Sequence, residues 1–460
     1  MRFVVNMLLA RLLAPEQFGL MALVLASIGL FETLTEVGVR QSVIQNKKGD
    51  TPEFLNIAWW FSGIRGVGLY LIGVIAAPYV AHFYGEPALV PLLRVVFLTM
   101  LFNGFTNPAL YVLEKKLQFG RYVWIVQGSA LAGTGLCLGL ALWIPSVWAL
   151  VAGVVAQAFL RFLGSFLVCP FRVSFQFDRQ SWSELFRFSR GMVGLPILTY
   201  LFVQADILFL GRMVDKEVLG LYSMALALAA TPQVLFTSIV GPMILPVLSE
   251  VQDSPEQLRC RLLRMTRLLF LFGLPMMTCL AIFSESILTV VYGQAYAQVS
   301  AAFSFVCGYI LLYLGGVLIA SAYLALGRPN VHRWFTIARV VIMGIILYPA
   351  IAGFGPTGAA GARLACMVLA GIVQQINLSR LIDLPVRQYL ATLKEGAVLS
   401  IVILPLVLVM RSSVETPIIK VGIAAGVCAL AWMYILWVKK ESIRTLFSQK
   451  QASPTAKGLS

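Results

Sequence analysis

Four arginines interrupt runs of apolar residues that are long enough to cross a lipid bilayer. Arg65, Arg161 and Arg363 lie well inside such runs, whereas Arg94 lies close to the end of its own run. A charged side chain at the centre of a bilayer costs roughly 2.5 to 3.5 kcal/mol or more unless it pairs with another charge or faces water. These arginines are therefore candidates for a functional site, although Arg94 is near enough to a helix end to reach the interface.

Carboxylates at comparable depths point to a second kind of chemistry. Glu32 and Glu36 are four residues apart on one face of a predicted helix, and Asp206 lies near the outer end of another. Any of the three can carry a proton or Na⁺ between the two faces of a membrane. The alternatives are structural. Glu32 and Arg65 are both about 12 Å from the inner ends of neighbouring helices at 1.5 Å per residue, so they can form a buried salt bridge; Glu36 can pair with Arg40, and Asp206 can lie at a surface-facing helix end.

The composition of the chain explains where these residues lie. Of its 460 residues 59% are hydrophobic and 12% are charged, and the mean hydropathy is +0.87. Soluble domains carry about 25% charged residues, and a membrane span needs about 20 apolar ones. The sequence predicts thirteen complete spans after a shorter first one, at 1–12, 18–38, 56–81, 90–112, 121–143, 146–169, 188–210, 218–246, 264–291, 299–326, 334–353, 357–379, 389–410 and 418–438.

The chain also repeats itself. The segment RLLAPEQFGL at 11–20 returns 201 residues later as RMVDKEVLGL at 212–221, with Arg, Glu, Gly and Leu in identical register. Internal repeats of this kind are typical of secondary transporters, and an even number of helices in each copy gives the copies one orientation. The repeat partner of the first helix begins near Phe188, and 188 minus 201 is −13, so we expect the first helix to begin upstream of Met1. A short first helix packed inside the bundle is the alternative, although unpaired backbone at membrane depth is costly.

The distribution of Lys and Arg predicts the orientation. If the N-terminus is cytoplasmic, the inside loops and the C-terminal tail hold 25 of these cations and the outside loops hold five, namely Arg11, Arg212, Lys216, Arg411 and Lys420. The positive-inside rule then places both termini in the cytoplasm. The net charge of +15 is spread over short loops, which argues against a nucleic-acid partner.

Several classes of function are disfavoured by what the sequence lacks. It has no glycine-rich phosphate loop ending in Gly-Lys-Ser or Gly-Lys-Thr and no long extramembrane segment, which excludes an ATP-driven pump in one chain and disfavours an enzyme. The seven cysteines form no Cys-x-x-Cys pair, so we predict packing roles for them and no metal site. The spacing of Gly135 and Gly139 predicts a close contact between helices.

Two stretches of sequence resemble a known family. They are LLARLLAPEQFGL at 8–20, followed by Gly38 and SVIQ at 42–45, and DILFLG at 206–211, leading to LGLY at 219–222. These segments resemble bacterial polysaccharide transporters, the O-antigen and exopolysaccharide flippases of the Wzx type. That family belongs to the multidrug/oligosaccharidyl-lipid/polysaccharide exporter superfamily, and the resemblance covers essentially the whole chain.

The resemblance implies an all-α polytopic membrane protein of about 14 transmembrane helices, with two six-helix lobes in parallel repeat around a central cavity and a C-terminal helix pair. We expect the N-terminal lobe at 1–170, a cytoplasmic linker with an amphipathic helix at 171–187 and the C-terminal lobe at 188–380. The terminal helix pair is expected at 381–438 and a cytoplasmic tail at 439–460.

The family also implies a cargo, an oligosaccharide on an undecaprenyl pyrophosphate carrier. It would be flipped by alternating access from the cytoplasmic to the periplasmic face of the bacterial inner membrane, for O-antigen, exopolysaccharide or capsule synthesis. Guanidinium groups match pyrophosphate oxygens in bidentate geometry. We therefore expect Arg65, Arg161 and Arg363 to line the cavity and bind the cargo, with Arg94 a weaker candidate; Arg161 and Arg363 have no obvious acidic neighbour.

The expected partners are the lipid-linked oligosaccharide, membrane lipids, and a polysaccharide polymerase and chain-length regulator of the same pathway. No cofactor is expected beyond coupling to H⁺ or Na⁺. A multidrug exporter or a lipid II flippase of the same superfamily remains an alternative, although exporters of that branch usually have twelve helices.

Overall fold

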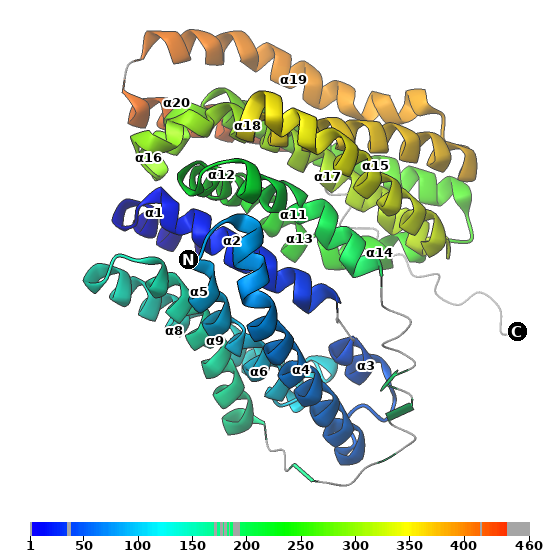
Figure 1. The fold of residues 1–460 in the computed structure, drawn as a ribbon. Helices are drawn as coiled ribbons and strands as arrows, with labels where there is room; N and C mark the ends of the chain where they lie inside the picture. Colours follow the sequence, from blue (N-terminus) through cyan, green and yellow to red (C-terminus); the bar gives the residue numbers. More distant parts are fainter. Residues whose placement is uncertain are drawn as a thin grey trace, which may run out of the picture. The chain divides into compact units, whose positions relative to one another are not determined.

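The computed structural model describes residues 2–34, 38–169, 194–414 and 416–438, together with 173–174, 178, 182–183 and 185–186. All the regular elements in this part of the chain are helices (Figure 1). Their bounds are α1 Arg2–Leu12, α2 Pro15–Leu34, α3 Val39–Gln45, α4 Pro52–Tyr84, α5 Leu89–Val96, α6 Leu98–Phe105, α7 Ala109–Lys115, α8 Phe119–Trp143, α9 Val147–Val168, α11 Leu195–Met213, α12 Lys216–Ala229, α13 Thr231–Ile239, α14 Gly241–Ser249, α15 Pro255–Ile282, α16 Ser284–Val291, the 3₁₀ helix η1 Gln294–Val299, α17 Ser300–Ala325, α18 Pro329–Leu381, α19 Val386–Ser413 and α20 Pro417–Val438.

Among the described residues, eleven helices are long and apolar enough to cross a membrane, or twelve if the bent pair 89–105 and 109–115 is one span. Helix α18 has 53 residues, which at 1.5 Å each is about 80 Å and far more than a bilayer needs. It contains a kink at Gly355, whose φ of 53° and ψ of −134° favour glycine, so it comprises two helices. The all-helical polytopic fold is confirmed, and the predicted fourteen helices are consistent with this structure.

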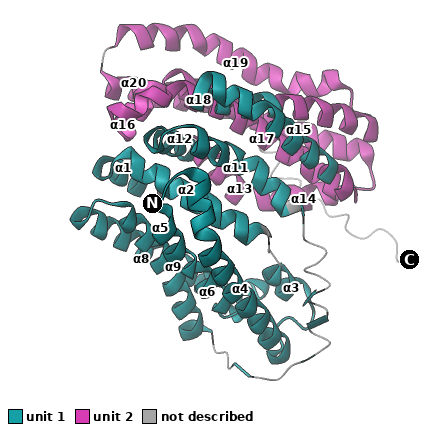
Figure 2. Cartoon of the chain, in the orientation of Figure 1, with its two compact units in different colours: residues 1–228, 333–366 teal, residues 229–332, 367–460 magenta. Residues whose placement is uncertain are grey.

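The chain forms two compact units (Figure 2). Unit 1 contains residues 1–228 and 333–366, and unit 2 contains residues 229–332 and 367–460. This division cuts through α18 and differs from the lobe boundaries expected from the repeat. Most of the linker expected at 171–187, and the whole tail expected at 439–460, lie outside the described residues. The two-lobe organisation therefore stays a prediction.

Within unit 1, the two copies of the repeated segment touch each other. A methyl group added to Gly19 of α2 would collide with the backbone carbonyl of Lys216, and one added to Gly220 of α12 would collide with that of Pro15. Because only glycine leaves room for this approach, the repeated Gly-Leu positions fix how closely the N-terminal turns of α2 and α12 pack.

Helices α8 and α9 of unit 1 pack against each other along their length. The predicted contact through Gly135 and Gly139 is wrong, because nothing lies within 4 Å of a methyl group built at either position. The close approach is at Gly133, two residues before Gly135. A methyl group on Gly133 would lie 2.7 Å from the carbonyl oxygen of Gly153, so the contact-making glycines are on two different helices.

Within unit 2, α15 is the central helix and packs against α17, α19 and α20. Arg267 of α15 forms an ion pair with Glu395 of α19. Five residues further along α15, Trp432 of α20 donates a hydrogen bond of 3.2 Å to the carbonyl oxygen of Phe272. These contacts attach the terminal helices α19 and α20 to this unit.

Candidate functional site

Unit 1 contains a polar cavity of about 420 Å³. Its walls come from the ends of α2 and α3, the middle of α4, helices α6 and α7, the start of α8 and the C-terminal half of α9. Three arginines from three different helices line it: Arg40 of α3, Arg65 of α4 and Arg161 of α9. Glu32 is the one carboxylate among the described residues that line it, so this described part of the wall carries more positive than negative charge.

Arg65 and Arg161, two of the predicted site residues, line this cavity together. The guanidinium of Arg65 donates a hydrogen bond of 2.9 Å to the backbone carbonyl oxygen of Glu32, which places these residues side by side, as their predicted depths suggest. The guanidinium of Arg161 donates to the side-chain oxygen of Asn103 on α6. These two bonds connect the cavity wall across α2, α4, α6 and α9.

Arg40 was not predicted as a site residue, because it lies in a short polar connection where a cation is ordinary. Its expected partner, Glu36, lies outside the described residues. In the structure Arg40 binds Glu114 of α7 through two hydrogen bonds, 2.9 Å from Nε to Oε2 and 2.6 Å from Nη2 to Oε1. The hydrogen bonding to Glu114 raises the pKa of Arg40 above its ordinary value, so the guanidinium stays charged.

A buried asparagine sets the direction of α7. The path of the chain bends by 62° between α6 and α7, and Asn107 lies in this break with no exposed surface. Its side-chain nitrogen donates to the carbonyl oxygens of Ser165 and Cys169 at the end of α9, and its oxygen accepts from the backbone N–H of Ala109. Because the break is tied to α9 in this way, α7 presents Tyr111 to the cavity.

The remaining polar lining suits a hydroxylated ligand. Tyr111 and Tyr122 offer aromatic faces with hydroxyl groups, and Ser62 and Asn103 offer further donors and acceptors. Asn103 of α6, an uncharged polar residue able to contact a glycan, lines this cavity. Guanidinium groups beside tyrosine and amide side chains can bind an anion attached to a sugar.

Arg363 lies elsewhere in unit 1 and is almost fully buried. Its Nη1 is 2.6 Å from Oδ2 of Asp206, the side chains are 3% and 0% exposed, and its Nη2 donates to the carbonyl oxygen of Val203. The hydroxyl of Tyr222 donates to the same carboxylate oxygen at 2.5 Å. The expectations that Arg363 has no acidic neighbour and that Asp206 ends a helix at the surface are corrected here. The two residues are 157 positions apart, and their pairing requires the packing of α11 against the second half of α18.

The other predicted residues lie outside the cavity. Arg94, at the end of α5, is exposed and is not among the lining residues, which fits the interfacial alternative. Arg339 is a further buried arginine of unit 1: it is 8% exposed inside α18, and its guanidinium lies 5.2 Å from the ring centre of Phe202. Cation–π contacts of this kind are a common way to hold a buried arginine.

Arg161 and Arg363 lie near each other's position in the internal repeat but not at it. They are 202 residues apart (363 minus 161), one more than the offset of the repeated segment. The position equivalent to Asp206 in the first copy is Val5 (206 minus 201), which carries no charge. The buried Asp206–Arg363 pair of the second copy therefore has no charged equivalent at position 5 of the first copy.

A polytopic helical protein with an internal repeat and a polar, arginine-lined cavity has the architecture of a membrane transporter. The chain matches the family described as "Polysaccharide biosynthesis protein" over residues 8–301. This match covers more than half of the chain, which belongs to that family.

Named relatives agree with the family. The chain is 25% identical over 376 residues to the lipopolysaccharide biosynthesis protein WzxC of Escherichia coli (strain K12), covering 80% of this chain and 74% of that protein. It is 25% identical over 359 residues to the succinoglycan biosynthesis transport protein ExoT of Rhizobium meliloti (strain 1021), covering 77% and 72%. It is also 26% identical over 313 residues to the amylovoran biosynthesis protein AmsL of Erwinia amylovora, covering 66% and 80%.

Solved structures show the same fold. The lipid II flippase MurJ in an inward closed conformation matches with a TM-score of 0.74 and 12% identity, over 96% of this chain and 97% of that one. A multidrug resistance MATE transporter of the MOP superfamily in an inward-facing conformation matches with a TM-score of 0.66 and 14% identity, over 83% and 94%. At these identities the likeness concerns the fold alone.

Proposed function

We propose that this protein translocates a lipid-linked oligosaccharide across the membrane for the synthesis of a surface polysaccharide, by alternating access. Its family and the named relatives support this function, and it acts as a transporter. The observation that carries the proposal is the cavity of unit 1, in which Arg40, Arg65 and Arg161 converge from three helices. A cluster of cations at membrane depth is energetically costly, and a cargo with several negative charges compensates for that cost.

In this proposal the cargo is carried on undecaprenyl pyrophosphate, and Arg65 and Arg161 bind the phosphates. Both line the cavity, where Arg65 donates to the backbone carbonyl oxygen of Glu32 and Arg161 to the side-chain oxygen of Asn103. Guanidinium groups bind phosphate oxygens in bidentate geometry. Tyr111 and Tyr122 then lie where they can contact the sugars nearest the phosphate.

Complementation tests this proposal. In a strain that lacks its own polysaccharide flippase, the wild-type chain should restore surface polysaccharide. Arg65→Gln and Arg161→Gln should each reduce it, because removing one charge-assisted bond costs about 1.5 to 3 kcal/mol and hence at least tenfold in binding. Arg94→Gln removes an exposed arginine outside the cavity and is the matched control. Full activity of the Arg65→Gln/Arg161→Gln double variant, at wild-type protein level, would refute the proposed site.

Location and coupling form part of the same proposal. The protein lies in the bacterial cytoplasmic membrane with both termini in the cytoplasm, and its product passes to a polymerase and a chain-length regulator. Transport is coupled to H⁺ or Na⁺, and Glu32 is the carboxylate best placed to sense the ion because it lines the cavity. Transport into proteoliposomes that is independent of both ion gradients would refute the coupling.

A further inference from the structure

Arg40 lines the cavity, but a carboxylate from outside it already holds the guanidinium. Glu114 is not among the lining residues, and it contacts Nε and Nη2 of Arg40 with both carboxylate oxygens. This two-point contact is the geometry with which a guanidinium binds a phosphate. A phosphate in the cavity and the carboxylate of Glu114 therefore compete for the same donors.

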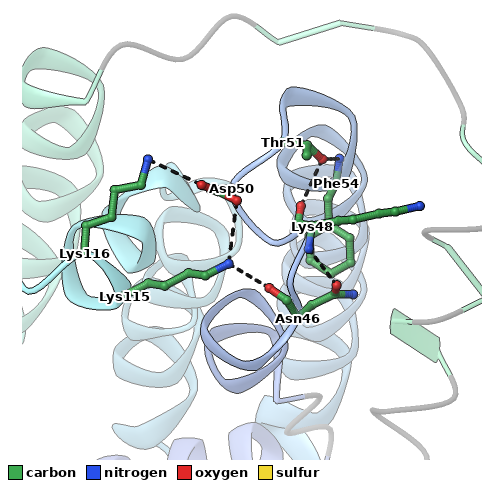
Figure 3. A network of polar contacts seen from close by, with 7 residues as sticks. All are labelled: Asn46, Lys48, Asp50, Thr51, Phe54, Lys115 and Lys116. Atoms are coloured by element: carbon green, nitrogen blue, oxygen red, sulfur yellow. Dashed lines mark hydrogen bonds and ion pairs between the residues drawn. The ribbon is translucent and has the colours of Figure 1, made fainter.

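The competition matters because this ion pair joins two short helices that form part of the cavity wall. Arg40 is on α3 and Glu114 on α7. A second set of contacts joins the same elements, as Figure 3 shows. Lys115 donates to the backbone carbonyl oxygen of Asn46 at 2.7 Å, and the ammonium groups of Lys115 and Lys116 lie 3.6 and 3.4 Å from the carboxylate of Asp50.

The first contact is also easy to exchange. The side chains of Arg40 and Glu114 are 49% and 21% exposed, and pairs with this much access to water are weak. A diphosphate carries more charge than one carboxylate, and Arg40, Arg65 and Arg161 all line the cavity in which it would bind. An anion of this kind is able to displace Glu114 from Arg40.

We propose that Glu114 is an internal counter-ion that holds Arg40 until a diphosphate group replaces it, so that ligand binding removes the Arg40–Glu114 contact between α3 and α7. This inference rests on the proposed function, and it adds a positioning residue and a mechanical consequence to the same site. Glu114 lowers the affinity for the ligand because it competes for Arg40. When the ligand binds, one contact within the cavity wall is lost.

The test measures ligand affinity of the full chain in lipid nanodiscs, with inorganic pyrophosphate and with undecaprenyl diphosphate as separate probes. Glu114→Gln should bind about two- to fivefold tighter than wild type, the factor expected from removing a competing exposed ion pair. Asp50→Asn is the matched control, because it breaks the neighbouring contacts between the same elements and leaves Arg40 untouched. It should leave the affinity unchanged.

A double-variant cycle separates competition from misfolding. In an Arg40→Gln background, the gain from Glu114→Gln should disappear, because there is no guanidinium left to compete for. If both probes bind with equal affinity, the site recognises the diphosphate itself. If the lipid-linked probe binds more tightly, the polyprenyl chain adds contacts. In either case a gain in affinity from Glu114→Gln supports the role of Glu114 as a counter-ion.

Loss of the Arg40–Glu114 contact has its own readout. Spin labels are placed at Gln45→Cys, the last residue of α3, and at Gln118→Cys, three residues beyond the end of α7, and both positions are exposed. They report the separation of these two segments in a chain where Cys260 and Cys428 are serine. Undecaprenyl diphosphate should lengthen the distance in wild type, and Glu114→Gln should show the longer distance without ligand. Unchanged or weaker binding by Glu114→Gln, or an equal gain from Asp50→Asn, would overturn the inference. Failure of wild type to bind either probe would overturn the proposed site itself.

Discussion

Asp206 and Arg363 form a buried ion pair, in which each charge depends on the other. Both are almost inaccessible to water, and the hydroxyl of Tyr222 and the carbonyl of Val203 complete the cluster. Removing two charges from water is compensated only when each keeps its partner. The pair therefore behaves as one structural group that links α11 to the second half of α18.

Asp206→Asn should destabilise the protein strongly, because it leaves the Arg363 charge buried without its counter-charge. Loss of one partner of a buried pair costs about 3 to 5 kcal/mol, which thermal unfolding of the purified chain in detergent will detect. Replacing both partners, with Asp206→Leu and Arg363→Met, should recover most of that loss. Wild-type unfolding of the single variant would mean that water or another group already screens Arg363.

The depth of Arg65 and Arg161 within apolar runs was enough to predict both as interior residues, and the structure places them in one cavity. The sequence alone could not distinguish these two arginines from Arg363. An arginine inside an apolar run is stabilised either by a buried acidic partner or by a water-filled cavity, and the run looks the same in both cases. Arg40 was missed for the opposite reason. Its neighbours are polar, and its partner Glu114 is 74 residues away.

At the scale of elements, apolar length predicted the helices and left their interruptions undetermined. The runs at 90–112 and 218–246 were predicted as single spans, whereas the structure breaks the first at Thr106–Pro108 and divides the second among α12, α13 and α14. Pro108 disfavours a continuing helix at the first break, and Asn107 beside it finds hydrogen-bond partners on α9 that compensate for the lost helical bonds. Such compensation depends on a distant helix, and no local pattern encodes it.

The contact between the repeated segments gives a prediction about helix packing. Gly220→Ala should lower the stability by about 1 to 3 kcal/mol, because the new methyl group meets the backbone of Pro15, which cannot rotate away. Gly139→Ala on α8 is the control, since nothing lies within 4 Å of the added methyl group. It should be neutral or slightly stabilising. Thermal unfolding of both variants in the same detergent tests this prediction. Equal stabilities of Gly220→Ala and Gly139→Ala would show that α2 and α12 can move apart.

At the scale of the whole chain, the repeat preserves backbone contacts more faithfully than polar groups. Gly19 and Gly220 make equivalent contacts with each other's helices. Arg161 and Arg363 occupy nearly equivalent positions, yet one faces the cavity and the other is neutralised by Asp206, whose counterpart is Val5. The second arginine therefore belongs to a buried ion pair, whereas the first lines the cavity and donates to Asn103.

Membrane topology is the last property that the chain as a whole predicts. If α18 is two spans joined at Gly355, its two ends lie on the same side of the membrane and Phe354 lies on the other. The cations that flank it, Arg328 and Arg380, place those ends in the cytoplasm by the positive-inside rule. All three positions are exposed, so single cysteines there, with Cys260 and Cys428 replaced by serine, are accessible to a membrane-impermeant maleimide.

Phe354→Cys should therefore react in intact cells, whereas Arg328→Cys and Arg380→Cys should react only after the membrane is permeabilised. Opposite sides for positions 328 and 380 would make α18 a single crossing. That result would break the even number of helices per repeat and, with it, the parallel relation between the two copies. Inverted labelling of all three positions would keep the two spans and reverse the orientation, placing the Arg40–Glu114 contact at the outer end of the cavity.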